Sequence, residues 1–312
     1  MDEDKAKIIA MLNRDIEGEH MAIVQYLHHA YALGEGEMAC EIEAIAREEM
    51  YHFRWLAETI VSLGGELSLS RQPLDIGGPA RADMLRRDVK AEQDAIDLYR
   101  THLEAIQDEK IRLLLERIIS DEEAHKAQFS HFIEKLQAEG VAEEEVALGQ
   151  LPLEEKQRTL DILNAGVRHE YTVILQYLYH AFTTPQCPIT REMEMQAINE
   201  MQHLGWLAEE VAALGGSPDI ERDKVDTSKD TAKMLEADIA AERAVTADYG
   251  KQIEEIEDEE LKELLTRIRS HEIYHDKVFS EMLRKLRQGE KPPAPGPLGK
   301  LTVGSLLGQK QD

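Results

Sequence analysis

The sequence contains an internal repeat of about 150 residues, which accounts for most of its 312 residues. Residues 19–65 align with residues 170–216 at an offset of 151, and residues 84–130 align with residues 234–280 at an offset of 150. This period is far longer than the roughly 20–50 residues of a solenoid repeat. The repeat therefore predicts two copies of one domain, joined between Gly140 and Pro152.

Each copy has the pattern of four long helices. Apolar residues recur at steps of three and four, as in Leu12, Ile16 and Ile23, which is typical of the core face of a bundled helix. Glycine and proline cluster between these segments. The stretch 64–79 can run the length of a bundle, because its extended span of about 50 Å exceeds the roughly 37 Å of a 25-residue helix. We therefore expect an all-α fold of two tandem four-helix bundles, each with a long crossover between its second and third helices.

Acidic residues and histidines interrupt the apolar stripes at matching places in the two copies. A glutamate falls on the first and third helices of each copy, and a Glu-x-x-His motif on the second and fourth, so each Glu and His share one face. These residues are Glu19, Glu49, His52, Glu92, Glu122 and His125 in the first copy, and Glu170, Glu200, His203, Glu242, Glu272 and His275 in the second. This combination is the ligand set of a dinuclear carboxylate centre.

Charge supports the same interpretation. Four carboxylates that face one core repel each other, and each loses several kcal/mol of hydration. No lysine or arginine lies on the stripes to pair with them, whereas two divalent ions bring four positive charges. Oxygen-rich ligation with one imidazole per metal favours iron or manganese over zinc. We expect two metal ions per bundle and four per chain, with Glu49 and Glu122 as bridging ligands in the first copy.

Two further sets of residues are candidates to support these centres. Asp88 and Asp238 lie one turn before the third-helix glutamates, where we expect each to accept the free N–H of a ligand histidine. Tyr26, Tyr99, Tyr177 and Tyr249 each follow a predicted ligand by seven residues. Three roles are open for these tyrosines: a hydrogen bond to a carboxylate, electron donation, or packing alone.

Composition excludes other classes of function. With 36 Lys and Arg against 62 Asp and Glu, the net charge is −26, which disfavours binding to nucleic acid or to anionic lipid. Neither a basic-then-apolar leader nor an apolar run of membrane-spanning length is found. Cys40 and Cys187 occupy non-equivalent places in the repeat and form no disulfide framework, so we expect a reducing cytoplasm. The oligomeric state is left open, since the acidic outer helix faces suit a monomer or a homo-oligomer.

At this point the sequence resembles a known family. The segments LNRDIEGEHMAIVQYLHHA, EEMYH, MLRRDVKAE and DEEAH, and the second set LNAGVRHEYTVILQYLYHA, NEMQH, MLEADIAAE and SHEIYH, are similar to bacterioferritin, within the ferritin-like di-iron superfamily. The resemblance implies a ferroxidase that oxidises Fe(II) with O2 or H2O2 and supports iron storage. It also implies haem b at Met50 and Met201, which directly follow Glu49 and Glu200.

Alternatives to a ferroxidase stay open at this point. The third-helix tyrosines depart from the bacterioferritin pattern towards rubrerythrin, but no Cys-x-x-Cys module is present. A rubrerythrin-like peroxidase, or a manganese catalase with Mn in place of Fe, is the next hypothesis. A non-catalytic cargo that binds iron or haem is the third.

The C-terminal segment carries a separate signal. Residues 289–300 are rich in proline and lead to LTVGSLLG at Leu301–Gly308, a pattern typical of a docking peptide on an extended tether. This string resembles the targeting peptide of encapsulin cargo proteins. It implies an encapsulin shell protein as partner and a place inside an encapsulin compartment in the cytoplasm. The predicted organisation is a first bundle at 1–140, a linker at 141–152, a second bundle at 153–288, and the tether and the peptide.

Overall fold

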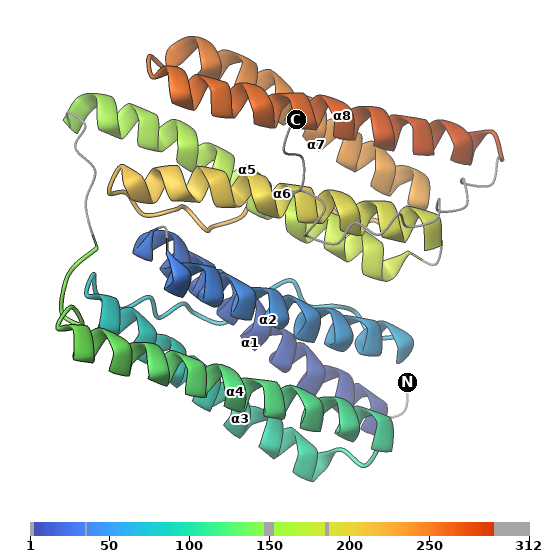
Figure 1. Cartoon of the computed structure of the whole chain (residues 1–312). Coiled ribbons are helices and arrows are strands. Elements are labelled where there is room, and N and C mark those ends of the chain that lie inside the picture. The colour runs from blue at the N-terminus through green and yellow to red at the C-terminus, as the bar shows by residue number, and fades with distance from the viewer. Residues whose placement is uncertain (1–2, 35, 147–152, 185–186, 290–312) are drawn as a thin grey trace, which may run out of the picture.

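The computed structural model describes residues 3–34, 36–146, 153–184 and 187–289. These residues form eight α-helices in two groups of four (Figure 1). In chain order the helices are α1 (Glu3–Leu33), α2 (Glu37–Ser62), α3 (Arg81–Ala105), α4 (Glu109–Glu139), α5 (Leu153–Thr183), α6 (Cys187–Ala213), α7 (Thr231–Glu255) and α8 (Glu259–Arg287). The predicted all-α fold of two tandem four-helix bundles is confirmed.

Local sequence signals explain where several helices begin and end. The side chain of Asp108 accepts hydrogen bonds from the backbone N–H groups of Lys110 and Ile111 at the start of α4. Asp258 does the same for α8, and Asp230 caps α7. Such caps satisfy N–H groups that have no partner inside the helix. Gly140 ends α4 in the left-handed conformation, with φ of 77°, which glycine adopts without steric cost.

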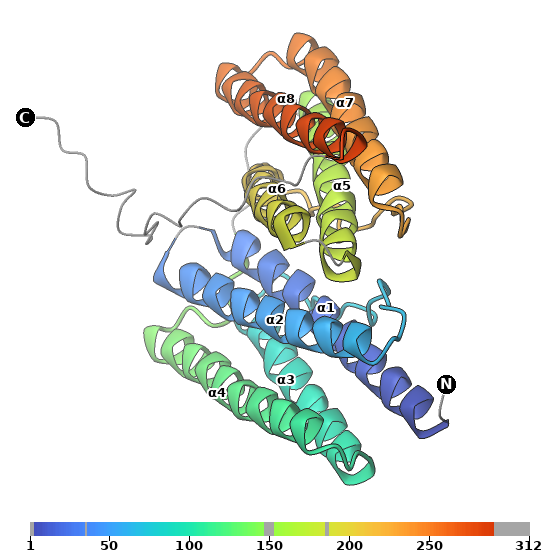
Figure 2. The same ribbon diagram turned by 90° about the vertical axis from the view of Figure 1, so that its right-hand side faces the viewer.

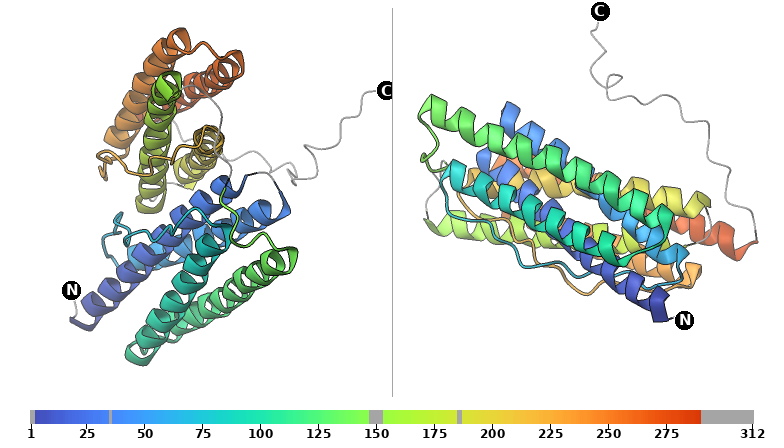
Figure 3. Two further views of the ribbon diagram at one scale, coloured as in Figure 1. Left: turned by 90° about the vertical axis from the view of Figure 1, so that its left-hand side faces the viewer. Right: turned by 90° about the horizontal axis from the view of Figure 1, so that it is seen from below.

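The long crossovers predicted between the second and third helices are present in both bundles (Figure 3). Hydrogen bonds near both ends of the first crossover attach it to α1. Asn13 donates to the backbone oxygen of Glu66 at 2.9 Å, and the backbone N–H of Asp75 donates to Gln25 at 3.0 Å. The second crossover repeats this pattern on α5 through Asn164 and Gln176. Each crossover therefore runs along the side of its bundle.

The apolar core of each bundle is divided in two along the helix axes. In the first bundle one cluster includes Leu12, Leu56 and Leu115, and the other includes Ile42 and Phe129. The second bundle has two clusters as well. Full burial of one such side chain stabilises the fold by about 1.5–3 kcal/mol. The predicted metal-ligand residues lie between the two clusters, at the middle of the bundle.

The two bundles pack through their first hairpins. Helix α1 contacts α6 and α2 contacts α5, whereas the hairpins α3–α4 and α7–α8 lie on the outer sides (Figure 2). At this interface the Tyr171 hydroxyl lies 2.6 Å from Nε2 of His20. These two residues are equivalent positions of the repeat, so they lie close to the pseudo-twofold axis that relates the bundles. Among the described residues, no helix has the length and apolar character needed to cross a membrane.

Candidate metal centre

The predicted ligand residues of each copy converge on one buried point. In the first bundle Glu19 comes from α1, Glu49 and His52 from α2, Glu92 from α3, and Glu122 and His125 from α4. Every one of the twelve predicted ligands in the two bundles has at most 4% of its surface exposed. The spacing of three within each Glu-x-x-His motif places both side chains one above the other on the inner face of the helix.

The converging atoms form two overlapping groups in each bundle. Within each group the candidate ligand atoms lie within 4.8 Å of one another. In the first bundle Glu49 and Glu122 belong to both groups, and in the second bundle Glu200 and Glu272 do. The remaining residues belong to one group each: Glu19 with His52, Glu92 with His125, Glu170 with His203, and Glu242 with His275. This arrangement suits two metal positions that share two carboxylates.

The shared carboxylates point one oxygen at each imidazole. In the first bundle Oε2 of Glu49 lies 2.8 Å from Nδ1 of His52, and its Oε1 lies 2.8 Å from Nδ1 of His125. In the second bundle Glu200 lies 2.7 Å from Nδ1 of both His203 and His275. In every histidine it is therefore Nδ1 that faces the centre. A carboxylate placed in this way could bind two ions, each of which would have one imidazole ligand.

Burial and mutual repulsion shift the acid–base behaviour of the first centre. Burial raises the pKa of Glu19 and of Glu92 well above the ordinary carboxyl value, and the nearby charges of Glu122 and Glu49 raise it further. Burial acts to lower the pKa of His125, but hydrogen bonds to Glu122 and Glu49 outweigh it and raise the pKa to about 11. Burial opposes ionisation of Glu122, yet hydrogen bonds with Glu92 and the histidines hold its pKa below the usual range.

The second centre shows the same pattern. Burial raises the pKa of both Glu170 and Glu242. Hydrogen bonds to Glu200 and Glu272 outweigh the effect of burial on His203 and raise its pKa to about 9. Without metal ions, both centres therefore retain protons that a bound cation displaces.

Several ligand atoms have no hydrogen-bond partner among the described residues. They include Oε2 of Glu92 in the first bundle and Oε2 of Glu242 in the second. Buried polar atoms normally have a partner, because leaving one unsatisfied costs about 1–3 kcal/mol. Carboxylate oxygens with one imidazole nitrogen per group are a donor set that suits iron or manganese. The residues present therefore fit a pair of such ions.

The four tyrosines contact the glutamates of the opposite helix. The Tyr26 hydroxyl on α1 donates to Glu92 on α3 at 2.8 Å, and Tyr99 on α3 donates to Glu19 on α1. In the second bundle Tyr177 donates to Glu242, and Tyr249 donates to Glu170. All four tyrosines are at most 1% exposed. Of the three roles considered from the sequence, the hydrogen bond to a carboxylate is the one that the geometry contains.

The expectation for Asp88 and Asp238 was wrong in its partner. Asp88 accepts hydrogen bonds from Nδ1 of His29 at 2.8 Å and from Gln25 at 3.0 Å, and Asp238 accepts from the equivalent residues His180 and Gln176. Asp88 lies one turn before Glu92 on α3, away from the level of the centre, and there it meets α1. The predicted ligand histidines lie on α2 and α4, out of its reach. Both aspartates therefore join α1 to α3, or α5 to α7.

Sequence reasoning missed the groups that contact the outer nitrogen of the ligand histidines. Nε2 of His125 lies 2.8 Å from Glu48, and Nε2 of His52 lies 3.5 Å from Asp121. The acidic pairs Glu48–Glu49 and Asp121–Glu122 are a signal that could have identified them, since each outer group directly precedes a ligand. In the second bundle Nε2 of His203 lies 2.9 Å from Nδ1 of His271.

Two cavities border the predicted site residues. One, of about 520 Å3, lies between α1 and α3 of the first bundle and is lined by Gly18, Lys90 and the ligands Glu19, Glu92 and Glu122. It gives the first centre access to the surface. The other, of about 550 Å3, lies between the two bundles and is lined mainly by apolar side chains, with Met50 and Met201 among them. The structure thus brings together the two methionines that the sequence singles out.

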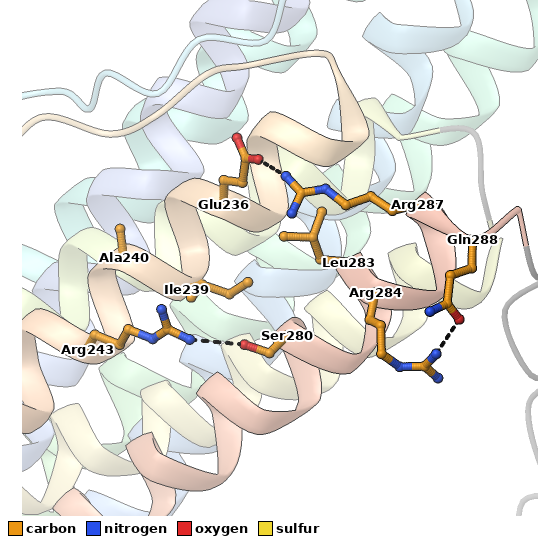
Figure 4. A pocket seen from close by; sticks show the side chains of 9 residues that line it. All are labelled: Glu236, Ile239, Ala240, Arg243, Ser280, Leu283, Arg284, Arg287 and Gln288. Carbon is orange, nitrogen blue, oxygen red and sulfur yellow. Dashed lines mark hydrogen bonds and ion pairs between the residues drawn. The ribbon is translucent and has the colours of Figure 1, made fainter.

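A third hollow lies away from both centres. It is a groove of about 690 Å3 between α7 and α8, lined by arginines and apolar residues (Figure 4). Arg287 pairs with Glu236 there, and Arg243 contacts Asp276 at 3.0 Å. None of the predicted site residues lines this groove.

The helical bundles define a ferritin-like protein, with a buried cluster of carboxylates and imidazoles in each half that suits two metal ions. A comparison with protein families supports this: the Ferritin family, described as a ferritin-like domain, matches residues 9–138 and again 160–289. These matches cover well over half of the chain. The chain therefore belongs to the ferritin family, as a tandem bacterioferritin-like protein.

Individual relatives agree with this assignment. The chain is 32% identical over 136 residues to a bacterioferritin of Desulfovibrio desulfuricans, and the aligned region covers 42% of this chain and 76% of that protein. It is 34% identical over 128 residues to a bacterioferritin of Rhodobacter capsulatus, covering 38% of this chain and 78% of the relative. A third relative is the encapsulin nanocompartment cargo protein EncC of Myxococcus xanthus, 32% identical over 89 residues, or 28% of this chain and 62% of that protein.

Solved structures include the bacterioferritin of Desulfovibrio desulfuricans. It aligns with 48% of this chain and 95% of its own, at 28% identity and a TM-score of 0.43.

Proposed function

We propose that both centres are ferroxidase sites, which oxidise Fe(II) to Fe(III) with O2 or H2O2 for iron storage and detoxification. The observation that carries this proposal is the pair of overlapping ligand groups in each bundle, which share Glu49 and Glu122 in the first and Glu200 and Glu272 in the second. Membership of the ferritin family and the bacterioferritin relatives support it.

In this proposal the protein binds the substrate ions and balances their charge. Two Fe(II) ions supply the two electrons that reduce one H2O2 to water, so the centre must accept an added positive charge on each ion. Glu49 and Glu122 contribute carboxylates to both positions, and Glu19 and Glu92 complete four negative charges against the ions. The hydroxyls of Tyr26 and Tyr99 fix the orientation of Glu92 and Glu19 by donating to them.

Access and exclusion of water follow from the same residues. The ligands are almost fully buried, so the surrounding apolar clusters keep bulk water from the metal positions. In the first bundle the cavity between α1 and α3 reaches Glu19, Glu92 and Glu122. A small oxidant and a hydrated cation can approach the first centre along this cavity.

A double substitution tests the proposal. Glu49→Ala with Glu200→Ala removes one shared carboxylate from each centre, and we expect the ferric absorbance that develops on mixing with Fe(II) and O2 or H2O2 to be abolished. Glu123→Ala is the matched control, because Glu123 lies beside Glu122 on α4 with its side chain 55% exposed. Unchanged growth of ferric absorbance in the double variant would refute the assignment. Purified protein that contains manganese and disproportionates H2O2 would instead support the manganese catalase alternative.

Haem b is the second cofactor that we propose, in the cavity between the bundles. Met50 and Met201 both line it and occupy equivalent places in the repeat, so their thioethers are the groups that would hold a haem iron there. Its volume of about 550 Å3 is in the usual range for cofactor sites. Haem-reconstituted protein is expected to lose its methionine-ligated Soret spectrum in Met50→Leu, whereas Met38→Leu, on the same helix but not among the lining residues, serves as the control.

Packaging is the third part of the proposal. We propose that residues 301–308 dock on the inner wall of an encapsulin shell in the cytoplasm, with residues 289–300 as a tether. Both ranges lie outside the described residues, apart from Gly289. The EncC relative, which is named as an encapsulin cargo protein, supports this part. Deletion of residues 301–312 is expected to abolish co-purification with a co-expressed shell protein and to leave iron oxidation unchanged.

A further inference from the structure

The two centres differ in the groups that hold their ligand histidines from outside. In the first centre both outer groups are carboxylates: Glu48 lies 2.8 Å from Nε2 of His125, and Asp121 lies 3.5 Å from Nε2 of His52. The repeat replaces Glu48 with Asn199 and Asp121 with His271 in the second centre. The inner ligands of the two centres are identical in type, so the outer groups are where the centres diverge.

The hydrogen-bond geometry fixes the charge of the outer partner in the second centre. In the metal-loaded centre Nδ1 of His203, which faces the carboxylates, would bind the ion, so its Nε2 would carry the proton and donate outward. The acceptor is Nδ1 of His271 at 2.9 Å, and an imidazole nitrogen that accepts a hydrogen bond has a free lone pair. His203 is therefore held by a neutral group, where His52 faces a carboxylate.

An anionic outer partner makes an imidazole a stronger ligand. A carboxylate that accepts the N–H of a ligand histidine increases the basicity of the other nitrogen, which strengthens its bond to the metal. The added negative charge also favours Fe(III) over Fe(II), because the ferric ion carries one more positive charge. A neutral imidazole does less of both. The first centre should thus bind metal more tightly and hold the ferric state better.

A nearby cation reduces the effect of one outer carboxylate of the first centre, Asp121, but not that of the other, Glu48. Arg117 lies 2.7 Å from Asp121 and offsets part of its charge. The side chain of Glu48 is 60% exposed, but it makes the shorter contact to its histidine, and no lysine or arginine of the described residues forms an ion pair with it. At the second centre, Arg267 stacks on Trp206, whose ring lies 6.3 Å from that of His271. The Glu48–His125 contact therefore contributes most of the asymmetry.

We propose that the two centres divide the work: the first retains its metal ions as a permanent centre, and the second binds iron more weakly and passes it on to storage. This inference rests on the proposed function, because it assigns different tasks to two ferroxidase sites. Glu48 is a positioning residue in it, since it acts on the metal only through His125.

The test uses two full-length proteins that each retain one centre. Glu200→Gln with Glu272→Gln leaves the first centre, and Glu49→Gln with Glu122→Gln leaves the second; the Gln substitutions preserve volume at these buried positions. Zn2+ affinity, measured by competition with a chelator, gives a readout that is independent of oxidation. We expect the first centre to bind Zn2+ roughly 10- to 100-fold more tightly. A redox titration of the iron-loaded proteins, followed by electron paramagnetic resonance, should give the first centre the lower midpoint potential.

Exchange of the outer groups shows whether they cause the difference. In the protein that retains the first centre, Glu48→Gln should weaken Zn2+ binding by roughly 10-fold or more, and Glu48→Asp should restore most of it. In the protein that retains the second centre, Asn199→Glu should strengthen it. Glu41→Gln, on the same helix as Glu48 but hydrogen-bonded to Gln128 away from the ligand histidines, is the control.

Each outcome decides between the proposals. Equal Zn2+ affinities and equal potentials in the two single-centre proteins overturn the division of work and leave the ferroxidase proposal standing. The division of work is also overturned if the affinities differ but Glu48→Gln and Asn199→Glu change neither. If wild-type protein itself binds no metal at either centre, the proposed function fails together with this inference. Intact protein offers a check without substitutions, because Zn2+ should leave it in two phases of equal size during dialysis against chelator.

Discussion

Metal binding to these centres should displace a large number of protons. In the metal-free first centre, burial and the neighbouring carboxylates raise the pKa of Glu19 and Glu92 well above the usual range. Hydrogen bonds to the glutamates raise the pKa of His125 to about 11, and that of His52 as well. The two imidazoles therefore carry protons at pH 7, and the two carboxyls retain theirs to a higher pH than exposed carboxyls do. Two divalent ions bring four positive charges, so protons and metal ions neutralise the same carboxylates.

The expected magnitude follows from this count. The two imidazoles alone release two protons per centre, or one for each ion bound, and the raised pKa of the two carboxyls brings this number towards two. Each displaced proton weakens metal binding by about 1.4 kcal/mol for every unit by which the pH falls. For one to two protons per ion, the apparent affinity should fall by roughly 10- to 100-fold per pH unit. The second centre should behave similarly around pH 7, since the pKa of His203 is raised to about 9 and that of His275 to about 12.

Calorimetry measures this release directly. Zn2+ is titrated into metal-free protein at pH 7 in two buffers of different protonation enthalpy, and the difference in heat gives the number of protons released. Glu123→Ala serves as the control and should release the same number. A release below about one proton per ion would show that the buried groups are already deprotonated without metal, and it would refute the argument from burial and repulsion.

Three further predictions follow. Glu19 and His125 bind protons more tightly in the folded than in the unfolded protein, so the metal-free protein should lose stability as the pH rises from about 5 to 9, by about 1 kcal/mol or more per pH unit. Urea unfolding at several pH values checks this, and stability that rises with pH would contradict it. Gly18→His should place an imidazole in the cavity beside the first centre and slow the loading of that centre with Fe(II) on the order of tenfold. Stopped-flow absorbance in protein that lacks the second centre measures this rate, and an unchanged rate would exclude the cavity as the route of entry. Asp88→Ala should cost about 3–5 kcal/mol of folding free energy, because it leaves the buried imidazole of His29 without its carboxylate partner. Thermal unfolding that matches wild type would refute this role.

The fold was predictable from the sequence because period and spacing specify it. Apolar steps of three and four require helices with one buried face, and Leu12, Ile16 and Leu115 are buried as expected. The crossover could be assigned from length alone, since a chain must extend from one end of the bundle to the other. The convergence of Glu19, Glu92 and the two Glu-x-x-His motifs followed from their place on the buried stripes.

The contacts of individual side chains were less predictable. Register along one helix identifies its inner face, but which neighbouring helix a side chain meets depends on how the helices are rotated and staggered. Asp88 shows this. The sequence places it one helical turn before Glu92 on α3, but its contact with His29 depends on the packing of α1 against α3. The outer groups Glu48 and Asp121 were missed for the same reason, since they lie beside the inner stripe and reach histidines of the opposite helix.

Anomalous X-ray scattering from crystals soaked in ferrous salt under anaerobic conditions tests the central claim most directly. If buried carboxylates point inward because cations neutralise them there, iron peaks should appear at all four ligand groups, two per bundle, with Glu49 and Glu122 bound to both ions of the first pair. Iron found only on the acidic outer surface, with the twelve inner side chains paired among themselves, would contradict the account.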